Sequence, residues 1–285
     1  MGRLLSEAAK FVVNSIASLG LNVQSGSRFD LMYKTLHNPD GTSRDIKPDD
    51  PNFGVACEAL RDITQLEYFF DVVDLSIESR ELRSKVIRLI NDTVLPQGST
   101  TQSPGRDVQA ELFVFAACRK AGLNPTFQEP DIVCLLDHQK IAVAVKRIKN
   151  LKQLVKRIRE GASQIKKAGG CGIVFVDVVI AMNPRNYRAI ARESDVVFGL
   201  KWMCLLRKVI NGYHDLIQKS IKGKNVLAVI LHDHWIRMDL NKHWGLETMT
   251  YRIPAKEIDS SLLSYLDIFS KKYLSAFPNL TKLTK

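Results

Sequence analysis

The stretch Pro130–Lys146, with the sequence PDIVCLLDHQKIAVAVK, decides the fold that we expect. Its two apolar runs, Ile132–Leu136 and Ile141–Val145, are rich in valine, leucine and isoleucine and have the length of strands. The polar residues Asp137–Lys140 lie between the runs and predict a four-residue hairpin loop. The stretch is therefore expected to form an antiparallel β-hairpin.

This hairpin places the side chains of interest on one face of a sheet. A four-residue loop pairs Asp131 with Lys146 and Val133 with Ala144, and residues that pair across an antiparallel hairpin share a face. Because side chains alternate along a strand, Asp131, Ala144 and Lys146 are expected on the same side of the sheet. A slip by one residue would separate Asp131 from Lys146.

The elements on either side of the hairpin predict a mixed sheet flanked by helices. A helical pattern covers Val108–Ala121 before it, another covers Leu151–Lys167 after it, and an apolar run follows at Ile173–Ile180. A helix that connects two parallel strands makes a right-handed crossover. Further patterns predict helices at Tyr187–Arg192, Leu205–Ser220 and Leu262–Phe277 and a buried strand at Val226–Leu231. We therefore expect an α/β fold with a mixed central sheet.

Helical periodicity dominates the first hundred residues and predicts a separate, all-helical domain. The periodic segments are Leu4–Leu19, Val55–Phe70 and Ser79–Ile90, with a polar loop at Asn38–Phe53. Turn and linker residues then collect at Leu95–Gly105 without any period. We place the boundary near residue 100, between an N-terminal helical domain at 1–100 and an α/β domain at 101–285.

The positive charge of the chain is concentrated after residue 100. The whole sequence has a formal net charge of +11. Residues 1–100 hold 11 Lys and Arg against 14 Asp and Glu, whereas the other 185 residues hold 30 against 16. A basic domain joined to a mildly acidic one indicates a polyanionic partner such as nucleic acid, although an ordinary basic surface would have the same composition.

Nine basic residues between Lys146 and Lys167 stand against a single acid, Glu160. Apolar residues recur on one face of the same segment, so we expect this helix to pack on the sheet and to present its charges outward. Such a face can follow a phosphate backbone; the alternative is a solvated basic face. The residues that we expect to contact nucleic acid are Arg147, Lys149, Lys152, Lys156, Arg157 and Arg159.

Apolar runs and cysteines favour a cytoplasmic protein. The longest apolar runs, such as Val226–Leu231, are far shorter than the roughly 20 residues of a membrane span. The N-terminus lacks the apolar stretch of a signal peptide. The five cysteines contain no Cys-x-x-Cys pair, which argues against a disulfide framework and against a thiolate zinc site. We expect a cytoplasmic protein that does not contact membranes.

Four sequence features resemble the PD-(D/E)XK nuclease superfamily over about residues 106–180. They are Glu111 in the helix before the hairpin, Pro130-Asp131 at the start of its first strand, Ala144-Val145-Lys146 at the end of its second strand, and Gln164 on the basic helix. In that superfamily these positions hold a helix carboxylate, a Pro-Asp metal ligand, an acidic-x-Lys pair and often a glutamine near the substrate. The resemblance implies a restriction-endonuclease-like sheet flanked by helices.

The resemblance also implies a site for Mg²⁺ or Mn²⁺ and a nuclease activity. Cleavage of a phosphodiester requires a divalent cation that neutralises developing charge and activates a water, and Mg²⁺ prefers oxygen ligands. A lysine near the scissile phosphate can orient the attacking water. The implied catalytic residues are Asp131, Ala144, Lys146, Glu111 and Gln164, and the implied metal-binding positions are Asp131, Glu111 and Val145.

Ala144 departs from the pattern of the superfamily, which has a metal-binding acid at this position. Alanine offers no ligand atom beyond its backbone. Three explanations are open: an engineered knockout of an active enzyme, a natural pseudo-nuclease, or an acid that has moved to another position, for which Asp177 and Glu129 are the nearby candidates. The otherwise intact surroundings of Ala144 favour the first.

These observations predict a metal-dependent nuclease that acts on nucleic acid, with DNA favoured over RNA, and a setting in bacterial or phage-related defence by analogy with the superfamily. The N-terminal helical domain is expected to bind a partner protein, to form a homodimer or to select the substrate. One alternative is a non-catalytic nucleic-acid-binding pseudo-nuclease or scaffold, and another is an interaction protein with no nucleic-acid role. His232 and His234 point the same way from one strand, as a metal-binding pair would, but no third ligand matches them.

Overall fold

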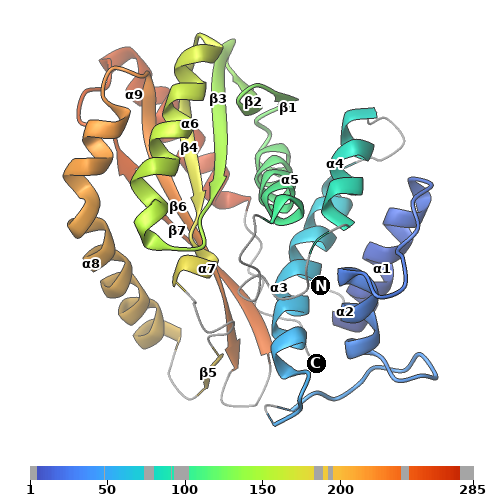
Figure 1. Ribbon diagram of the computed structural model, residues 1–285. Helices are drawn as coiled ribbons and strands as arrows, with labels where there is room; N and C mark the ends of the chain where they lie inside the picture. The colour runs from blue at the N-terminus through green and yellow to red at the C-terminus, as the bar shows by residue number, and fades with distance from the viewer. Residues whose placement is uncertain are drawn as a thin grey trace.

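A mixed β-sheet forms the centre of the C-terminal part of the chain, and helices cover both of its faces (Figure 1). The computed structural model describes residues 5–47, 49–73, 80–90, 92, 103–182, 189–191, 195–238 and 244–276. The helices are α1 (Leu5–Ser18), α2 (Arg28–Leu36), α3 (Phe53–Val72), α4 (Arg80–Ile90), α5 (Pro104–Lys120), the 3-10 helix η1 (Leu151–Gln153), α6 (Leu154–Ala168), α7 (Val179–Met182), α8 (Asp195–Ile221) and α9 (Ser260–Ser275). The strands are β1 (Pro125–Gln128), β2 (Asp131–Leu136), β3 (Gln139–Arg147), β4 (Cys171–Asp177), β5 (Ala189–Ala191), β6 (Val226–Met238) and β7 (Trp244–Pro254). The prediction of an α/β fold with a mixed sheet and an N-terminal helical region is confirmed.

The sheet contains both antiparallel and parallel pairs of strands. Its described strands follow the order β1-β2-β3-β4-β6-β5, and β7 pairs with β6 outside this path. β1, β2 and β3 form an antiparallel meander, and β4 continues the sheet parallel to β3. Because α6 connects β3 to β4, the segment from α5 to β4 has the predicted order of helix, hairpin, crossover helix and strand, with β1 added before the hairpin.

The hairpin turn between β2 and β3 is tighter than predicted. It consists of Asp137 and His138, whose φ angles of 47° and 68° lie in the left-handed region. Val133 therefore pairs with Ala142, and the predicted pairing of Val133 with Ala144 across a four-residue loop is wrong by two residues. A shift of two residues keeps every side chain on its own side of the sheet, so the predicted site residues still share a face.

Two hydrophobic clusters hold helices against opposite faces of the sheet. One cluster joins Phe175 of β4 to Phe113 of α5 and to α9, and it extends through α1–α4. The other joins Val174 of β4 to Ile158 of α6 and Ile210 of α8. Since neighbouring residues of a strand point to opposite faces, β4 is buried on both sides, which accounts for its almost entirely apolar sequence.

The N-terminal helices α1–α4 pack on α5 and share its hydrophobic cluster. Val12 and Ile16 of α1, Ile63 and Leu66 of α3 and Leu82 of α4 are buried in it. Within the described ranges, no helix is long and apolar enough to cross a membrane. The predicted domain boundary near residue 100 lies outside the described residues.

Several elements differ from the sequence-based expectations. The sequence did not predict α2, β1 or β7, and the predicted strand Ile173–Ile180 ends at Asp177, where α7 follows. Within the predicted helix Tyr187–Arg192, residues Ala189–Ala191 form β5 and pair with the end of β6, while the rest of that segment lies outside the described part of the chain. Pairing with β6 therefore overrides the helix propensity of the two alanines in β5.

Candidate functional site

The first residue of β2 and the last residues of β3 meet at one edge of the sheet. There the Asp131 Oδ2 atom accepts a hydrogen bond from the Val145 backbone N–H, at 2.8 Å, and another from the Lys146 ammonium, at 3.0 Å. The ammonium also donates to the Val145 carbonyl oxygen, at 3.0 Å. The structure thus brings together three of the positions that the sequence resemblance implies.

Glu111 lies on α5 and is ion-paired with a lysine of α4. The Lys85 ammonium lies 2.6 Å from the Glu111 Oε2 atom, and the two side chains are only 13% and 15% exposed. Lys85 also lies over the ring of Phe127, 4.8 Å from its centroid. An ion pair at this distance is strong when both groups are largely shielded from water. Lys85 is therefore a fixed counter-ion of Glu111.

The pKa of Asp131 is raised to about 6. Burial is the main cause, because it disfavours the charged carboxylate; Lys146 opposes this effect, and the negative charge of Glu111 adds to it. The raised pKa indicates that the ion pair with Lys146 only partly offsets the cost of burying the Asp131 carboxylate. A cation placed between Asp131 and Glu111 would lower this pKa.

Ala144 is fully buried beneath α6. A Cβ atom added at Gly161 of α6 would lie only 3.2 Å from the Ala144 Cβ and 3.0 Å from Val174 Cγ1. Helix and sheet are therefore in close contact at this position, and the packing has no room for a longer side chain unless α6 moves. This packing weighs against an engineered knockout, because an acid at position 144 would not fit the present arrangement.

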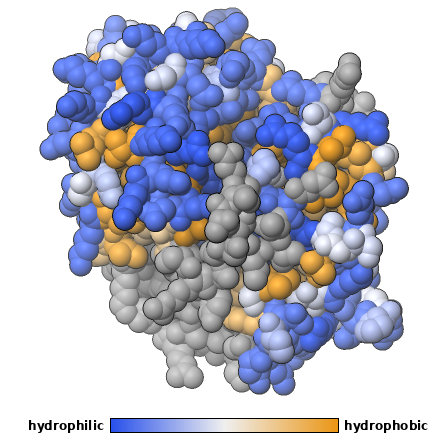
Figure 2. Space-filling model, viewed as in Figure 1, coloured by the Kyte–Doolittle hydropathy of each residue, from blue (hydrophilic) through white to orange (hydrophobic). Residues whose placement is uncertain are grey.

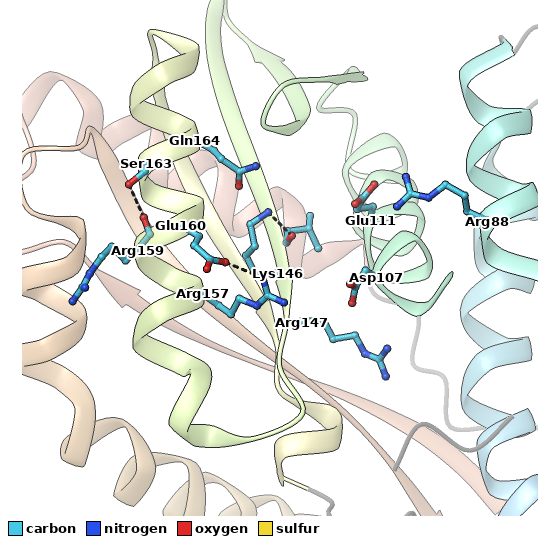
Figure 3. A pocket seen from close by; sticks show the side chains of 11 residues that line it. Arg88, Asp107, Glu111, Lys146, Arg147, Arg157, Arg159, Glu160, Ser163 and Gln164 are labelled. Atoms are coloured by element: carbon cyan, nitrogen blue, oxygen red, sulfur yellow. Dashed lines mark hydrogen bonds and ion pairs between the residues drawn. The ribbon is translucent and has the colours of Figure 1, made fainter. Parts of the chain in front are cut away.

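A cleft of about 680 Å³ opens between α4, α5, the end of β3 and α6 (Figure 3). Figure 3 shows Glu111 and Asp107 projecting from α5, opposite Lys146 of β3 and Gln164 of α6. The Gln164 Oε1 atom is buried and makes no hydrogen bond with the described residues. The lining residues are Arg88, Asp107, Glu111, Val145, Lys146, Arg147, Arg157, Arg159, Glu160, Ser163 and Gln164.

Three of the predicted nucleic-acid contacts form an exposed basic face on η1 and α6. Lys152, Lys156 and Arg159 are exposed and lie close to one line along the helix because they are spaced by four and three residues. Hydrophilic side chains cover the region of α6 in Figure 2. Each of the three keeps its charge at the surface, as a contact with phosphate requires.

The other three predicted contacts lie in different surroundings. Arg157 is ion-paired with Glu160 at 2.9 Å, and Lys149 is half-buried, which lowers its pKa. The Arg147 side chain is only 6% exposed and lies 3.5 Å from the Asp177 carboxylate. The Arg147 side chain therefore lies mostly buried at the edge of the cleft and not on the exposed basic face.

Sequence reasoning missed three charged residues in or beside the cleft. Arg88 and Lys85 come from α4, within the predicted separate domain, and Asp107 lies one turn before Glu111 on α5. Burial raises the pKa of Asp107. The spacing of Asp107 and Glu111 by four residues places both on one face of α5 and could have indicated an acidic pair, but no sequence signal places α4 beside α5.

His232 and His234 are buried against α5. They do not form the metal-binding pair that their spacing in the sequence resembled. Their rings pack against each other and against Phe113 with centroids 4.2 to 5.3 Å apart. Burial lowers the pKa of His232 to about 4 and that of His234 well below its usual range. Among the described residues, no group of three or more His, Cys, Asp or Glu side chains could hold a metal ion. The candidate oxygen donors in and below the cleft are thus the carboxylates of Glu111 and Asp107, which line it, and that of Asp131, which lies beside Val145 and Lys146.

Comparisons with protein-family models and with curated proteins found no match. The function of the cleft is therefore inferred from its own geometry and charge.

Proposed function

We propose that the chain is a metal-dependent nuclease that binds nucleic acid in the cleft between α5 and α6 and hydrolyses its phosphodiester bonds. The order of elements from α5 to β4 supports the restriction-endonuclease-like core that the sequence resemblance implies. DNA is the favoured substrate, as predicted from the sequence resemblance. The role in defence remains a prediction of that resemblance, and the cytoplasmic location remains a prediction from the apolar runs, the N-terminal sequence and the cysteines.

The observation that carries the proposal is the meeting of Asp131, Val145 and Lys146 within 3.0 Å. Val145 and Lys146 line a cleft that Glu111 also lines, and Asp131 lies directly behind them. Asp131 and Glu111 supply carboxylate oxygens, and Lys146 supplies a positive charge beside them. Oxygen donors and an ammonium group at one point are what hydrolysis of a phosphodiester requires. The exposed cations of α6 lie beside the same cleft.

The two carboxylates fit a hard cation such as Mg²⁺ or Mn²⁺. Mg²⁺ is commonly bound by one or two carboxylates together with waters and substrate phosphates, and the Asp131 side chain is mostly buried, so its carboxylate has few competing waters. When bound, the cation would neutralise charge on the phosphoryl oxygens and activate a water. Lys146 would then hold the phosphate and orient the water, while Gln164 would donate or accept a hydrogen bond at the wall of the cleft.

A second candidate function is non-catalytic binding of nucleic acid. Two observations favour it: Ala144 is packed under Gly161 with no room for the acid of the superfamily, and the carboxylates of Asp131 and Glu111 are each ion-paired with a lysine. In this alternative the ammonium groups take the place of the cation. The cleft and α6 would bind the backbone without cutting it.

Cleavage assays with the purified chain separate the two functions. Labelled single- and double-stranded DNA and RNA are incubated with Mg²⁺ or Mn²⁺ at pH 8, where Asp131 is charged. We expect cleavage that EDTA stops, and a loss of about a thousandfold or more, equivalent to about 4 kcal/mol, in Asp131→Asn and Lys146→Gln. Asp215→Asn is the matched control, since the Asp215 side chain is 92% exposed on α8. Binding without cleavage would establish the second candidate, and absence of both would overturn the proposal.

A further inference from the structure

Helix α4 of the N-terminal region places one cation in the cleft and a second cation beside it. Lys85 and Arg88 are three residues apart, so they lie on the same face of α4. Lys85 is paired with Glu111, and Arg88 lines the cleft and points toward Glu111 in Figure 3. The N-terminal region is therefore part of the candidate site and not only a neighbour of it.

The two cations have different tasks because their surroundings differ. Lys85 is mostly buried between the Glu111 carboxylate and the Phe127 ring, so its charge is already used inside the protein. Arg88 is exposed and makes no ion pair within the described part of the chain. A guanidinium in this situation can form paired hydrogen bonds with a phosphate, so Arg88 is the group of α4 that an incoming backbone would meet.

The opposite wall of the cleft is α6, and its floor is the end of β3. Gln164 and the ion pair of Arg157 with Glu160 face the cleft from α6. Asp131, below the floor, is only 14% exposed at its side chain. The candidate catalytic groups are thus recessed between two helical walls, so a phosphate has to enter the cleft to reach them.

The size of the cleft limits what can enter. Its volume of about 680 Å³ lies within the range of about 300–1,000 Å³ typical of sites for small ligands. A cleft of that size can take a few nucleotides of one strand. In a duplex, base pairing ties each strand to its partner, and both would have to pass between the walls. Enzymes that act on a base in a recessed pocket likewise take single-stranded substrate or extrude the nucleotide from the duplex.

We propose that α4 is the second wall of a single-strand binding cleft, and that Arg88 holds the backbone of one nucleic-acid strand against α6. The inference rests on the proposed binding of nucleic acid in the cleft, but it does not depend on cleavage. It gives the N-terminal helices a role in substrate choice. Positive groups on both walls would follow the backbone, as in other grooves that bind single strands.

Equilibrium binding in EDTA tests this inference without interference from cleavage. Fluorescence anisotropy is measured with a labelled single-stranded DNA oligonucleotide and with a blunt duplex of the same sequence, at several salt concentrations. We expect the single strand to bind about tenfold more tightly than the duplex. Arg88→Gln should weaken single-strand binding about fivefold and reduce the salt dependence by up to about 0.7 in logarithmic slope, the value for one lost phosphate contact.

Arg83→Gln is the matched control on the same helix. Arg83 is exposed, and it is five residues before Arg88, so it points away from the cleft, where it donates a hydrogen bond to the Gly20 carbonyl. We expect the Arg83→Gln variant to bind the single strand with the affinity of the wild type. Tighter binding of the duplex, or an unchanged affinity in Arg88→Gln, would overturn the inference alone. Absence of binding to any nucleic acid would overturn the proposed function as well.

Discussion

Each candidate metal-binding carboxylate of the cleft lies beside its own lysine. Asp131 is 3.0 Å from the Lys146 ammonium, and Glu111 is 2.6 Å from that of Lys85. The four charges balance before any cation binds, so a divalent cation would have to draw the carboxylates away from their ammonium partners. The lysines come from different elements, β3 and α4. The arrangement of the site therefore depends on how the N-terminal helices pack against α5.

The candidate site could be predicted in part because its key residues are local in sequence. Asp131 and Lys146 come from one hairpin, and an error of two residues in its register does not change the face on which they lie. Lys85 and Arg88 could not be predicted, because only tertiary packing places α4 beside α5. Arg147 was predicted to point outward because it follows Lys146 in a basic stretch of sequence. Its side chain is instead mostly buried beside Asp177.

Replacement of Ala144 by glutamate tests whether an acid fits this position. The structure predicts that Ala144→Glu destabilises the protein by about 3 kcal/mol or more, because the side chain would overpack the contact with Gly161 and bury a carboxylate. Urea denaturation measures the change. The control is Ala168→Glu, at an exposed position at the end of α6, the helix that carries Gly161. It should cost less than about 0.5 kcal/mol.

The opposite result for Ala144→Glu would revive the engineered-knockout explanation. A variant with wild-type stability that gained Mg²⁺-dependent cleavage would show that α6 adapts to the acid and that alanine removed a ligand. A destabilised variant without activity leaves alanine as the residue that the packing requires. The natural pseudo-nuclease and the two-carboxylate nuclease are then the remaining explanations.

The buried pair of histidines should make the protein sensitive to acid. The pKa of His232 is about 4 because burial disfavours the charged ring, whereas in the unfolded chain it is about 6.5. The stability that the neutral ring contributes is complete above pH 6.5 and is lost as the pH falls toward 4, by up to about 3 kcal/mol.

The comparison of His232→Gln with the wild type isolates this contribution. The difference in free energy of unfolding between the two proteins should become smaller between pH 7 and pH 4.5, as measured by urea denaturation, because glutamine does not titrate. His214→Gln, at a half-exposed position on α8, is the control for the loss of a histidine and should change the free energy of unfolding little at pH 7. A constant difference between His232→Gln and the wild type across this range would contradict the assignment.

At the scale of elements, α6 combines packing and charge on one helix. Ile158, Ala162 and Ile165 are fully buried against the sheet, while Lys152, before the helix, and Lys156 are exposed. Gly161 allows the close approach to β3 that leaves room only for alanine at position 144. The helix therefore sets both the shape of the cleft and the charge beside it.

The exposed cations of α6 should contribute affinity without base selection. Replacement of Lys152, Lys156 and Arg159 by glutamine should weaken binding of every single-stranded sequence and reduce the salt dependence by up to about 0.7 per lost phosphate contact. The triple change of Lys47, Lys219 and Lys271, which are exposed on other elements, removes the same charge and should have a smaller effect. Equal losses in the two triple variants would show that only net charge matters.

The elements that sequence reasoning missed lack a clear hydrophobic period. α2 buries Arg28 and Thr35 on its packed face, so its apolar pattern is interrupted. β7 interleaves threonine, glutamate and arginine with apolar residues and depends on its antiparallel pairing with β6. The turn at Asp137 and His138 contains neither glycine nor asparagine, the residues that usually mark a two-residue hairpin. Long amphipathic helices and apolar strands were predictable for the opposite reason.

At the scale of the whole molecule, a buried network of charges joins the N-terminal helices to α5. Arg106 of α5 lies 2.7 Å from Asp62 of α3 and 3.5 Å from Glu58. Arg28 of α2 is fully buried at 3.7 Å from Asp62. Burial raises the pKa of Asp62, but Arg106 and Arg28 outweigh this effect and hold it well below its usual range. The charges stabilise one another only while the helices remain in place.

The same network approaches the candidate site through the interior. A small cavity of about 10 Å³ is lined by Asp62 and Arg106 on the helical side and by Arg147 and Asp177 on the side of the sheet. Arg147 follows Lys146 in β3 and also lines the cleft. The position of the strand end that carries Lys146 is therefore tied to charges of α3 and α5.

This network predicts that the helical region and the sheet unfold together. Asp62→Asn removes the central negative charge and leaves Arg106 and Arg28 without their closest counter-ion, which should cost about 3–5 kcal/mol. The three tryptophans all follow residue 200, so their fluorescence reports on the α/β part, whereas far-UV circular dichroism reports on all helices. In the wild type we expect both probes to show the same urea transition. In Asp62→Asn the two transitions should again coincide but at a lower urea concentration, and in Asp215→Asn the midpoint should change little. Separate transitions would instead support an independent N-terminal domain with a boundary near residue 100. Helix α4, with Arg88, could then move away from the cleft while the α/β part stays folded.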